Sequence, residues 1–247
     1  MGSPFALSLA AFGCVIGGVL LGIWGHRYLP SGHRDSDTKE AVRLGMALVG
    51  TTVALVLGLL IASSKSFYDT QNNEVTEVAA NVVLLDRVLA HYGPETKDVR
   101  AALRESITSL VVDTGLRATF EPATFSGEVL FEKLQELSPQ TDNQRTLQAQ
   151  ALTLATKVGQ TRWLMYAQKA SSVPMPLLAI LVFWLTLLFM SFALFVRPNI
   201  MVVSSLVISA LAVCGAIFLI LEMYQPYTGL IQVSDAPLRS ALAQLGR

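Results

Sequence analysis

Apolar residues in this sequence fall into four long runs, and a polar stretch separates the second run from the third. The runs cover about residues 5–24, 44–64, 174–196 and 200–221. A helix rises about 1.5 Å per residue, so about 20 apolar residues cross a hydrocarbon core of about 30 Å. Each run therefore predicts one transmembrane helix. The first run has neither a basic leader nor an A-x-A-like site after it, which favours a retained helix over a signal peptide.

The polar stretch, residues 65–170, has the periodicity of helices that bury one face. Its first stripe continues out of the second apolar run in steps of three and four, through Val75, Val78, Val82, Leu85, Leu89 and Tyr92. Gly93-Pro94 predicts the end of that helix, because glycine terminates helices and proline suits the first turn of the next one.

Three further helices are expected in the same stretch. One runs from about Glu95 to Thr119 and a short one lies near Ser126–Leu137. A long one begins at about Asp142. The inward positions of the first are Val99, Leu103, Ile107, Leu110 and Thr114, and those of the last are Leu147, Ala151, Leu154, Val158, Thr161 and Met165. The helices that leave and re-enter the membrane should be antiparallel neighbours.

This pattern predicts an all-α integral membrane protein with an extramembrane helical bundle inserted between the second and third of four transmembrane helices. The expected domains are residues 1–64 (first two spans), 65–170 (bundle), 171–222 (last two spans) and 223–247 (tail). The tail contains an amphipathic stretch from Pro237 to Leu245.

Small residues recur every four positions on the first two spans, a spacing that lets helices approach closely in lipid. The predicted packing residues are Gly13, Gly17, Gly18, Gly22, Gly50, Ala54 and Gly58. The alternative is that glycine is simply frequent in membrane helices. At about 100° per residue, a different face of the second span combines Thr52, Val56, Leu59 and Ser63. That face is weakly polar at its ends and apolar at its middle.

The composition agrees with a lipid environment and gives no indication of a nucleic-acid partner. The chain has 52% hydrophobic and 15% charged residues, against about 25% charged in soluble proteins. Its 18 basic and 18 acidic residues give a formal net charge of zero, so no basic excess indicates a nucleic-acid partner. Both cysteines, Cys14 and Cys214, lie in apolar runs, which excludes a disulfide scaffold and a cysteine-rich zinc site.

No motif in the sequence indicates an enzyme, a metal site or a cofactor. The histidines, His26, His33 and His91, lack the clustered spacing of metal ligands. Phosphate-binding glycine loops and the G-x-S-x-G nucleophile elbow are absent. No ionisable residue lies deep within a span, which disfavours a proton-coupled pump, because proton relays need such groups. A pore needs none, since apolar rings can gate by dewetting.

Loop charges give the orientation. With four spans, the polar insert and both termini share one side, and the connector 26–43 faces the other. Basic residues of short loops prefer the cytoplasm, and this connector contains Arg27, Arg34, Lys39 and Arg43. The prediction is a multi-pass cell (inner) membrane protein whose insert and termini are extracytoplasmic.

The end of the chain resembles a known family. Pro226-Tyr227-Thr228-Gly229-Leu230-Ile231-Gln232-Val233-Ser234-Asp235-Ala236-Pro237 is similar to the P-[FY]-x-G-x-[IL]-x-V-S-x-x-P ending of the bacterial bestrophin-like family of unknown function. Asn81-Val82-Val83-Leu84-Leu85-Asp86-Arg87 is similar to its post-membrane helix. The resemblance implies a ring of identical subunits, a pentamer, with a path for small anions lined by the second span. No acidic calcium clasp is visible, so calcium gating is not carried over.

Three functions follow as hypotheses. The first is a homo-oligomeric ion channel in membrane lipid, lined by Thr52, Val56, Leu59 and Ser63, with Leu59 at the constriction. The second is a membrane-anchored sensor or adaptor whose insert binds a ligand or protein partner. The third is a structural assembly factor held by four anchoring helices.

Overall fold

The structure is a computed structural model that describes residues 3–28, 36–108, 111, 127–169, 175–195, 199–227 and 229–246. Within these ranges every regular element is a helix. The chain divides into two compact units. Unit 1 comprises Met1–Phe67 and Ser172–Gln225, and unit 2 comprises Tyr68–Ser171 and Pro226–Arg247. The all-α prediction is therefore confirmed.

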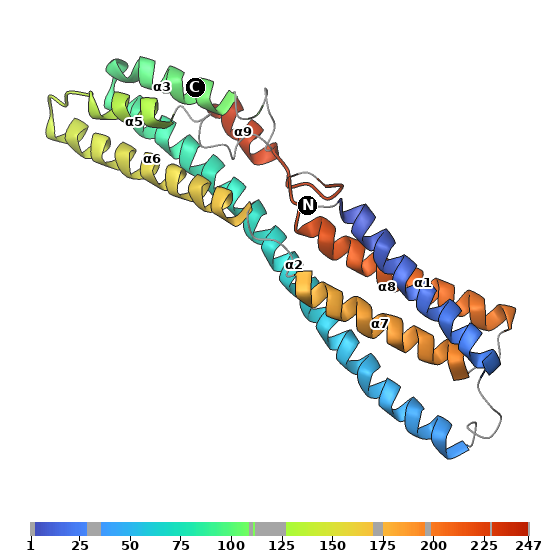
Figure 1. Cartoon of the computed structure of the whole chain (residues 1–247). Coiled ribbons are helices and arrows are strands. Elements are labelled where there is room, and N and C mark those ends of the chain that lie inside the picture. Colours follow the sequence, from blue (N-terminus) through green and yellow to red (C-terminus); the bar gives the residue numbers. More distant parts are fainter. Residues whose placement is uncertain are drawn as a thin grey trace. The chain divides into compact units, whose positions relative to one another are not determined.

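Unit 1 contains the four membrane helices (Figure 1). They are α1 (Pro4–Tyr28), the first part of α2 (Ser36–Tyr92), α7 (Met175–Phe195) and α8 (Ile200–Met223). All four are long and apolar enough to cross a membrane. The four predicted spans thus coincide with helices; three helices end within a few residues of the predicted bounds, and the second span is part of the longer helix α2.

Helix α1 packs along α7 and against α8, as Figure 1 shows. The core of unit 1 is aliphatic and includes Val15, Leu181, Ile217 and Ile220, each no more than 1% exposed. At the end of α1, the Nδ1 atom of His26 lies 2.8 Å from the carbonyl oxygen of Leu194. That carbonyl belongs to the last turn of α7, where helix carbonyls lack an intrahelical partner.

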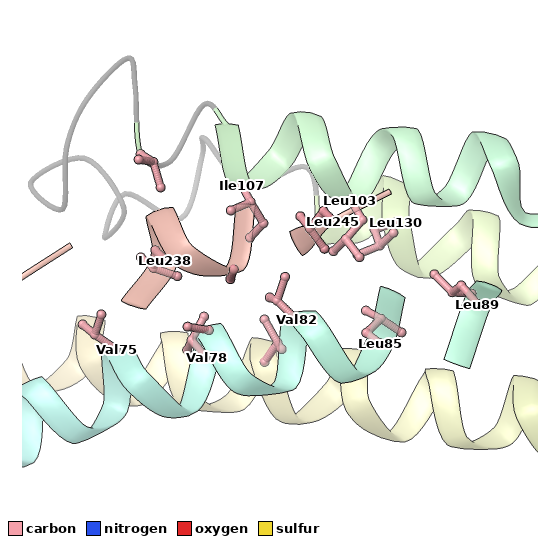
Figure 2. Packing of buried hydrophobic residues seen from close by; sticks show 14 of the residues in the cluster. Val75, Val78, Val82, Leu85, Leu89, Leu103, Ile107, Leu130, Leu238 and Leu245 are labelled. Carbon is pink, nitrogen blue, oxygen red and sulfur yellow. The ribbon is translucent and has the colours of Figure 1, made fainter. Parts of the chain in front are cut away.

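Unit 2 is a bundle built around the second part of α2. Its other elements are a 3-10 turn (η2, Pro94–Thr96), α3 (Lys97–Thr108), α5 (Gly127–Gln135), α6 (Asp142–Lys169) and α9 (Ala236–Gln244). Figure 2 shows the core, in which α2, α3, α5 and α9 meet. Its labelled side chains are Val75, Val78, Val82, Leu85, Leu89, Leu103, Ile107, Leu130, Leu238 and Leu245. The predicted α2 stripe is entirely buried, which confirms the periodicity argument.

Three interactions establish that α2 and α6 are antiparallel in unit 2. Gln71 and Gln168 are hydrogen-bonded, the Glu77 and Lys157 charges lie 3.8 Å apart, and the Gln144 amide donates to the Tyr92 carbonyl at 3.2 Å. Taken in order, the contacting residues lie progressively nearer the C-terminus on α2 and nearer the N-terminus on α6. This is the expected arrangement.

Helix α2 ends where the Gly93-Pro94 pair predicts. Gly93 has φ +138°, a conformation that side chains disfavour. Thr96, 1% exposed, donates its hydroxyl to the carbonyls of Leu89 at 2.7 Å and Gly93 at 2.8 Å. These bonds satisfy carbonyl groups that the helix end leaves unpaired.

The structure differs from the predicted boundaries in two places. Helix α2 begins at Ser36, so the second half of the connector 26–43 is helical. The tail is not separate from the bundle, because α9 buries Leu238 and Ala241 in the core of unit 2. The predicted positions Leu110, Thr114, Thr119 and Pro174 lie outside the described residues.

Candidate functional site

One side of the membrane part of α2 packs in the core of unit 1, and the opposite side is exposed. Val53, Leu60 and Ser64 are buried. Among the 18 consecutive residues that form the apolar part of α2, only 11% are buried. The corresponding shares are 33% for α1, 39% for α7 and 22% for α8. The uncovered side is a stripe that we call the open face; its exposed members are Leu44, Leu48, Thr52, Leu55, Leu59 and Ser63.

Three of the four predicted lining residues belong to this open face. Thr52, Leu59 and Ser63 are exposed, with Leu59 at 69%. Val56 is half-buried and packs against the core of unit 1. The Thr52 hydroxyl donates to the Leu48 carbonyl at 3.0 Å, so it is satisfied within its own helix. That these residues line a path remains a prediction.

The end of the open face meets the end of α8. The Ser63 and Tyr224 hydroxyls lie 3.2 Å apart. The Tyr224 ring stacks on Phe67 with centroids 5.3 Å apart and an interplanar angle of 22°. Ser64 donates to the Met223 sulfur at 3.9 Å. Tyr224 was not among the residues singled out by sequence, because an aromatic residue after an apolar run is common at membrane interfaces.

The predicted packing residues of α1 divide into two groups. A Cβ atom at Gly18 would lie 2.8 Å from the Thr186 carbonyl oxygen, and one at Gly22 would collide with the Met190 carbonyl oxygen. These two glycines therefore lie against the backbone of α7. A Cβ at Gly13 or Gly17 would meet nothing within 4 Å, so neither glycine packs within the described part of the chain.

The packing residues predicted on α2 differ in how closely other helices approach them. A Cβ at Gly50 would lie 3.3 Å from the Cδ1 atom of Leu188 on α7, a tight contact with a side chain that can give way. Gly58 has open space around it and Ala54 is exposed. Within the described residues, Gly50 thus lies in close contact with α7 and Gly58 does not.

Unit 2 contains a network of polar side chains that we call the Glu74 network: Gln71, Glu74, Gln168 and Tyr227. The Tyr227 hydroxyl donates to Gln71 Oε1, and Gln71 Nε2 donates to Gln168 Oε1 and, at 3.2 Å, to Glu74 Oε2. Gln168 Nε2 donates to Glu74 Oε1 at 2.9 Å. The network joins α2, α6 and the tail.

Burial shifts two of these groups toward their neutral forms. Desolvation raises the pKa of Glu74 above 4.5, and the nearby Glu77 charge adds to it, although the hydrogen bond from Gln168 acts in the opposite direction. Desolvation also raises the pKa of the Tyr227 phenol, with a contribution from the Glu74 charge. The phenol is therefore neutral at physiological pH.

A buried ion pair fixes the other end of the tail. Arg100 binds Asp86 with both donors, Nε to Oδ1 at 2.7 Å and Nη2 to Oδ2 at 2.9 Å, and the Gly246 amide donates to Asp86 Oδ2 at 3.2 Å. The Asp86 side chain is 3% exposed. Burial alone would raise the Asp86 pKa, but these hydrogen bonds outweigh it and the pKa lies below 3.8.

Sequence reasoning assigned no site to the polar residues of the bundle and so missed both clusters. Tyr227 and Asp86 did carry a signal, since each lies in a segment that resembles the bestrophin-like family. Within the described residues, no three histidine, cysteine, aspartate or glutamate side chains are grouped as a metal site. The arrangement suits holding a tail and presenting an open helix face in lipid.

Comparison with known proteins covers nearly the whole chain. Residues 13–238 match the family described as the Bestrophin-like domain, which confirms the resemblance first seen in the tail. No curated protein sequence matches the chain. Two solved structures of a bacterial bestrophin homologue from Klebsiella pneumoniae have the same fold. One carries an isoleucine-to-threonine mutation and has a TM-score of 0.65 at 16% identity, covering 94% of this chain and 97% of that chain. The other carries an aspartate-to-alanine mutation and has a TM-score of 0.60 at 16% identity, covering 95% and 98%.

Proposed function

Because the chain belongs to the bestrophin-like family, we propose that it forms a homo-oligomer in the cell (inner) membrane and conducts small anions along its second transmembrane helix. The observation that carries this proposal is the open face of α2, the least covered of the four spans. Helices α1, α7 and α8 each bury a larger share of their apolar residues than α2 does, and α2 keeps an exposed stripe. Identical subunits arranged in a ring, a pentamer by family resemblance, would turn such stripes toward a shared axis.

The chemistry of the open face supports a path with an apolar constriction. Thr52 and Ser63 provide hydroxyl groups on either side of Leu59, which is the largest side chain among the four lining candidates. An apolar ring conducts when it is hydrated and closes by dewetting, with no ionisable residue required. Val56 lies at the border between this face and the core, so we assign it the edge of the lining.

The first prediction is that Leu59→Ala increases anion flux. Shortening the side chain widens and partly hydrates the constriction, so the rate should rise at least about twofold. The unmodified protein and the variant would each be purified and reconstituted into liposomes loaded with chloride. The rates of chloride efflux from the two preparations would then be compared. Leu211→Ala is the matched control, because Leu211 is an exposed leucine of α8 outside the proposed path. Absence of flux in the unmodified protein, together with no effect of Leu59→Ala, would overturn the proposal.

The second prediction concerns orientation. The loop charges favour an extracytoplasmic position for unit 2 and both termini. In a Cys14→Ala background, we expect Ser240→Cys to react with a membrane-impermeant thiol reagent added to spheroplasts. Asn199→Cys, between the third and fourth spans, should react only after lysis. Both positions are exposed in the structure. The reverse labelling pattern would place unit 2 in the cytoplasm.

A further inference from the structure

The exposed side of α6 changes from polar to apolar near the end of the helix. From Asp142 to Gln160, its exposed residues are polar apart from Ala149. The exposed residues of the last two turns, which we call the Trp163 patch, are all apolar or aromatic: Trp163, Leu164, Tyr166 and Ala167. Single apolar side chains are common on protein surfaces, whereas a contiguous group marks a contact. This end of α6 therefore has the composition of a covered surface.

Two rings of the patch pack on each other. The Trp163 and Tyr166 ring centroids are 5.5 Å apart, with an interplanar angle of 33°. Each ring restricts the rotamers of the other, so less conformational entropy is lost when a partner covers them. Together with Leu164 they expose about 300 Å² of surface. Surface patches of this size on monomeric proteins are often functional.

Lipid is the first candidate for covering the patch, because tryptophan and tyrosine are frequent at membrane surfaces. The position of the patch along α2 argues against it. Gln168 is hydrogen-bonded to Gln71, which follows Ser64, the last residue of the second apolar run, by seven positions of α2. Seven helical residues span about 10 Å, whereas the headgroup layer extends only about 5–8 Å beyond the hydrocarbon core. The nearest end of the patch is therefore already beyond the lipid.

The rest of the patch is farther from the membrane. Since α6 is antiparallel to α2, Tyr166 and Trp163 lie about 3 Å and about 8 Å beyond Gln168 along the helix. Helical side chains also lean toward the N-terminus, which on α6 is the end away from the third span. A helix tilt of about 20° shortens these heights only slightly. The patch is therefore suited to a protein partner rather than to lipid.

A second exposed apolar side chain lies on the tail, close to the membrane-proximal end of the patch when measured along α2. Leu230 is 82% exposed. It belongs to a turn that is closed by the bond from the Val233 amide to the Pro226 carbonyl at 2.9 Å. The Tyr68 hydroxyl donates to the Gln232 carbonyl at 3.1 Å and so holds the turn beside α2. Tyr68 is one helical turn before the α2 residue that bonds to α6.

The patch and Leu230 lie on opposite sides of α2. Tyr68, which bonds to the tail, and Glu77, which pairs with Lys157 of α6 at 3.8 Å, are nine positions apart. At about 100° per residue, they point in nearly opposite directions from the helix axis. Figure 1 shows the same arrangement, with α6 along one side of α2 and α9 on the other. One subunit therefore presents two different apolar surfaces on its two sides.

We propose that Leu230 of one copy of this chain packs on the Trp163 patch of the next copy and joins unit 2 of neighbouring subunits head to tail. Two different surfaces that meet in this way generate a ring when the rotation closes. The patch is small beside the about 800 Å² that each partner buries in a stable interface. The contact therefore acts together with contacts between membrane helices. It rests on the homo-oligomer of the proposed function but not on anion flux.

Cross-linking of the full chain in liposomes tests the contact. In a background without Cys14 and Cys214, Leu230→Cys would be combined in turn with each large residue of the patch: Trp163→Cys, Leu164→Cys and Tyr166→Cys. After treatment with a short bismaleimide, we expect at least one pair to shift most of the protein to covalent dimers and larger species on a denaturing gel. Neither cysteine alone should do so, since the contact joins two different surfaces.

A pair outside the patch provides the control. Thr153 is exposed on α6 about 15 Å from Trp163 along the helix, so Leu230→Cys with Thr153→Cys should give no dimer. Light scattering of the unmodified protein in detergent separates the possible failures. An oligomer in which none of the three pairs cross-links overturns this inference alone, whereas a monomer overturns the proposed homo-oligomer as well. Linkage within one chain, without dimers, also overturns the inference.

Lipid contact predicts a different result in the same liposomes. A nitroxide attached to Ala167→Cys would be tested for collisions with oxygen, which dissolves in lipid, and with a nickel chelate, which stays in water. Contact with the next copy should lower both collision rates compared with a nitroxide at Thr153→Cys. A high rate with oxygen and a low rate with the chelate would assign the patch to lipid and overturn the inference.

Discussion

Arg100→Ala is expected to cost unit 2 about 3 kcal/mol of folding free energy, because it leaves the Asp86 carboxylate buried without its main partner. The remaining donor, the Gly246 amide, compensates for only part of the lost bidentate contact. For a chain of this size the loss corresponds to a fall in melting temperature of about 10 °C. Thermal unfolding of the purified protein in detergent, followed by circular dichroism, would measure it.

A second arginine–aspartate pair in unit 2 provides the control. Arg145 and Asp142 of α6 lie 3.1 Å apart, but both side chains are largely exposed, at 69% and 97%. Exposed pairs contribute about 0–1 kcal/mol. Arg145→Ala should therefore change the melting temperature little. Equal losses in the two variants would show that burial of Asp86 does not determine the effect.

The pH dependence of the same variant gives an independent check. With Arg100 present, the Asp86 pKa lies below 3.8, so its stabilising contribution is full above that value and is lost as pH falls through the lowered pKa. Without Arg100, burial should raise the Asp86 pKa. The difference in melting temperature between the unmodified protein and Arg100→Ala should then shrink at acid pH, where the orphaned carboxylate is protonated.

Helices and their buried faces could be predicted because both depend on local periodicity. The α2 stripe is one example. On α6, Ala151, Val158, Thr161 and Met165 are buried as predicted, while Leu147 and Leu154 are half-buried. A three–four repeat fixes which side of a helix is apolar regardless of what covers it. It also predicted that α2 would continue from the second span into the bundle.

Polar contacts could not be predicted in this way. Gln71 and Gln168 are 97 positions apart, and Gln71 and Tyr227 are 156 apart. No periodic signal distinguishes a glutamine that meets a distant partner from one that faces water. Asp86 is likewise a charged residue on a helix that supplies most of the bundle core, and its burial becomes intelligible only with Arg100 opposite. Tertiary pairing, not local preference, makes such positions tolerable.

Of the four residues that a helical projection of α2 places on one face, Thr52, Leu59 and Ser63 are exposed, and Val56 is half-buried for a geometric reason. At about 100° per residue, Val56 lies about 40° from Thr52, whereas Leu59 and Ser63 lie within about 20° of it. The core-facing Val53 lies on the same side as Val56. Val56 is therefore drawn toward the core, while the other three remain exposed. A helical projection gives the stripe, but only the packed neighbours show where it ends.

The close approach of α1 and α7 leads to the last prediction. A Cβ atom at Gly22 would collide with the carbonyl oxygen of Met190 and lie 2.7 Å from the Ala193 Cβ. Backbone cannot move aside as a flexible side chain can. Gly22→Ala should therefore separate the two helices and cost about 2–3 kcal/mol, the upper part of the range for overpacking. Thermal stability in detergent and resistance of unit 1 to proteolysis would both report the loss.

Gly17 provides the matched substitution on the same helix. A Cβ there meets nothing within 4 Å, so Gly17→Ala introduces no clash inside one subunit. Alanine also favours a helix over glycine by about 1 kcal/mol in water, which makes a neutral or slightly stabilising result the expectation. A clear loss at Gly17 would instead indicate that this face of α1 is covered by another molecule. Comparison of the two variants separates packing within the subunit from packing between subunits.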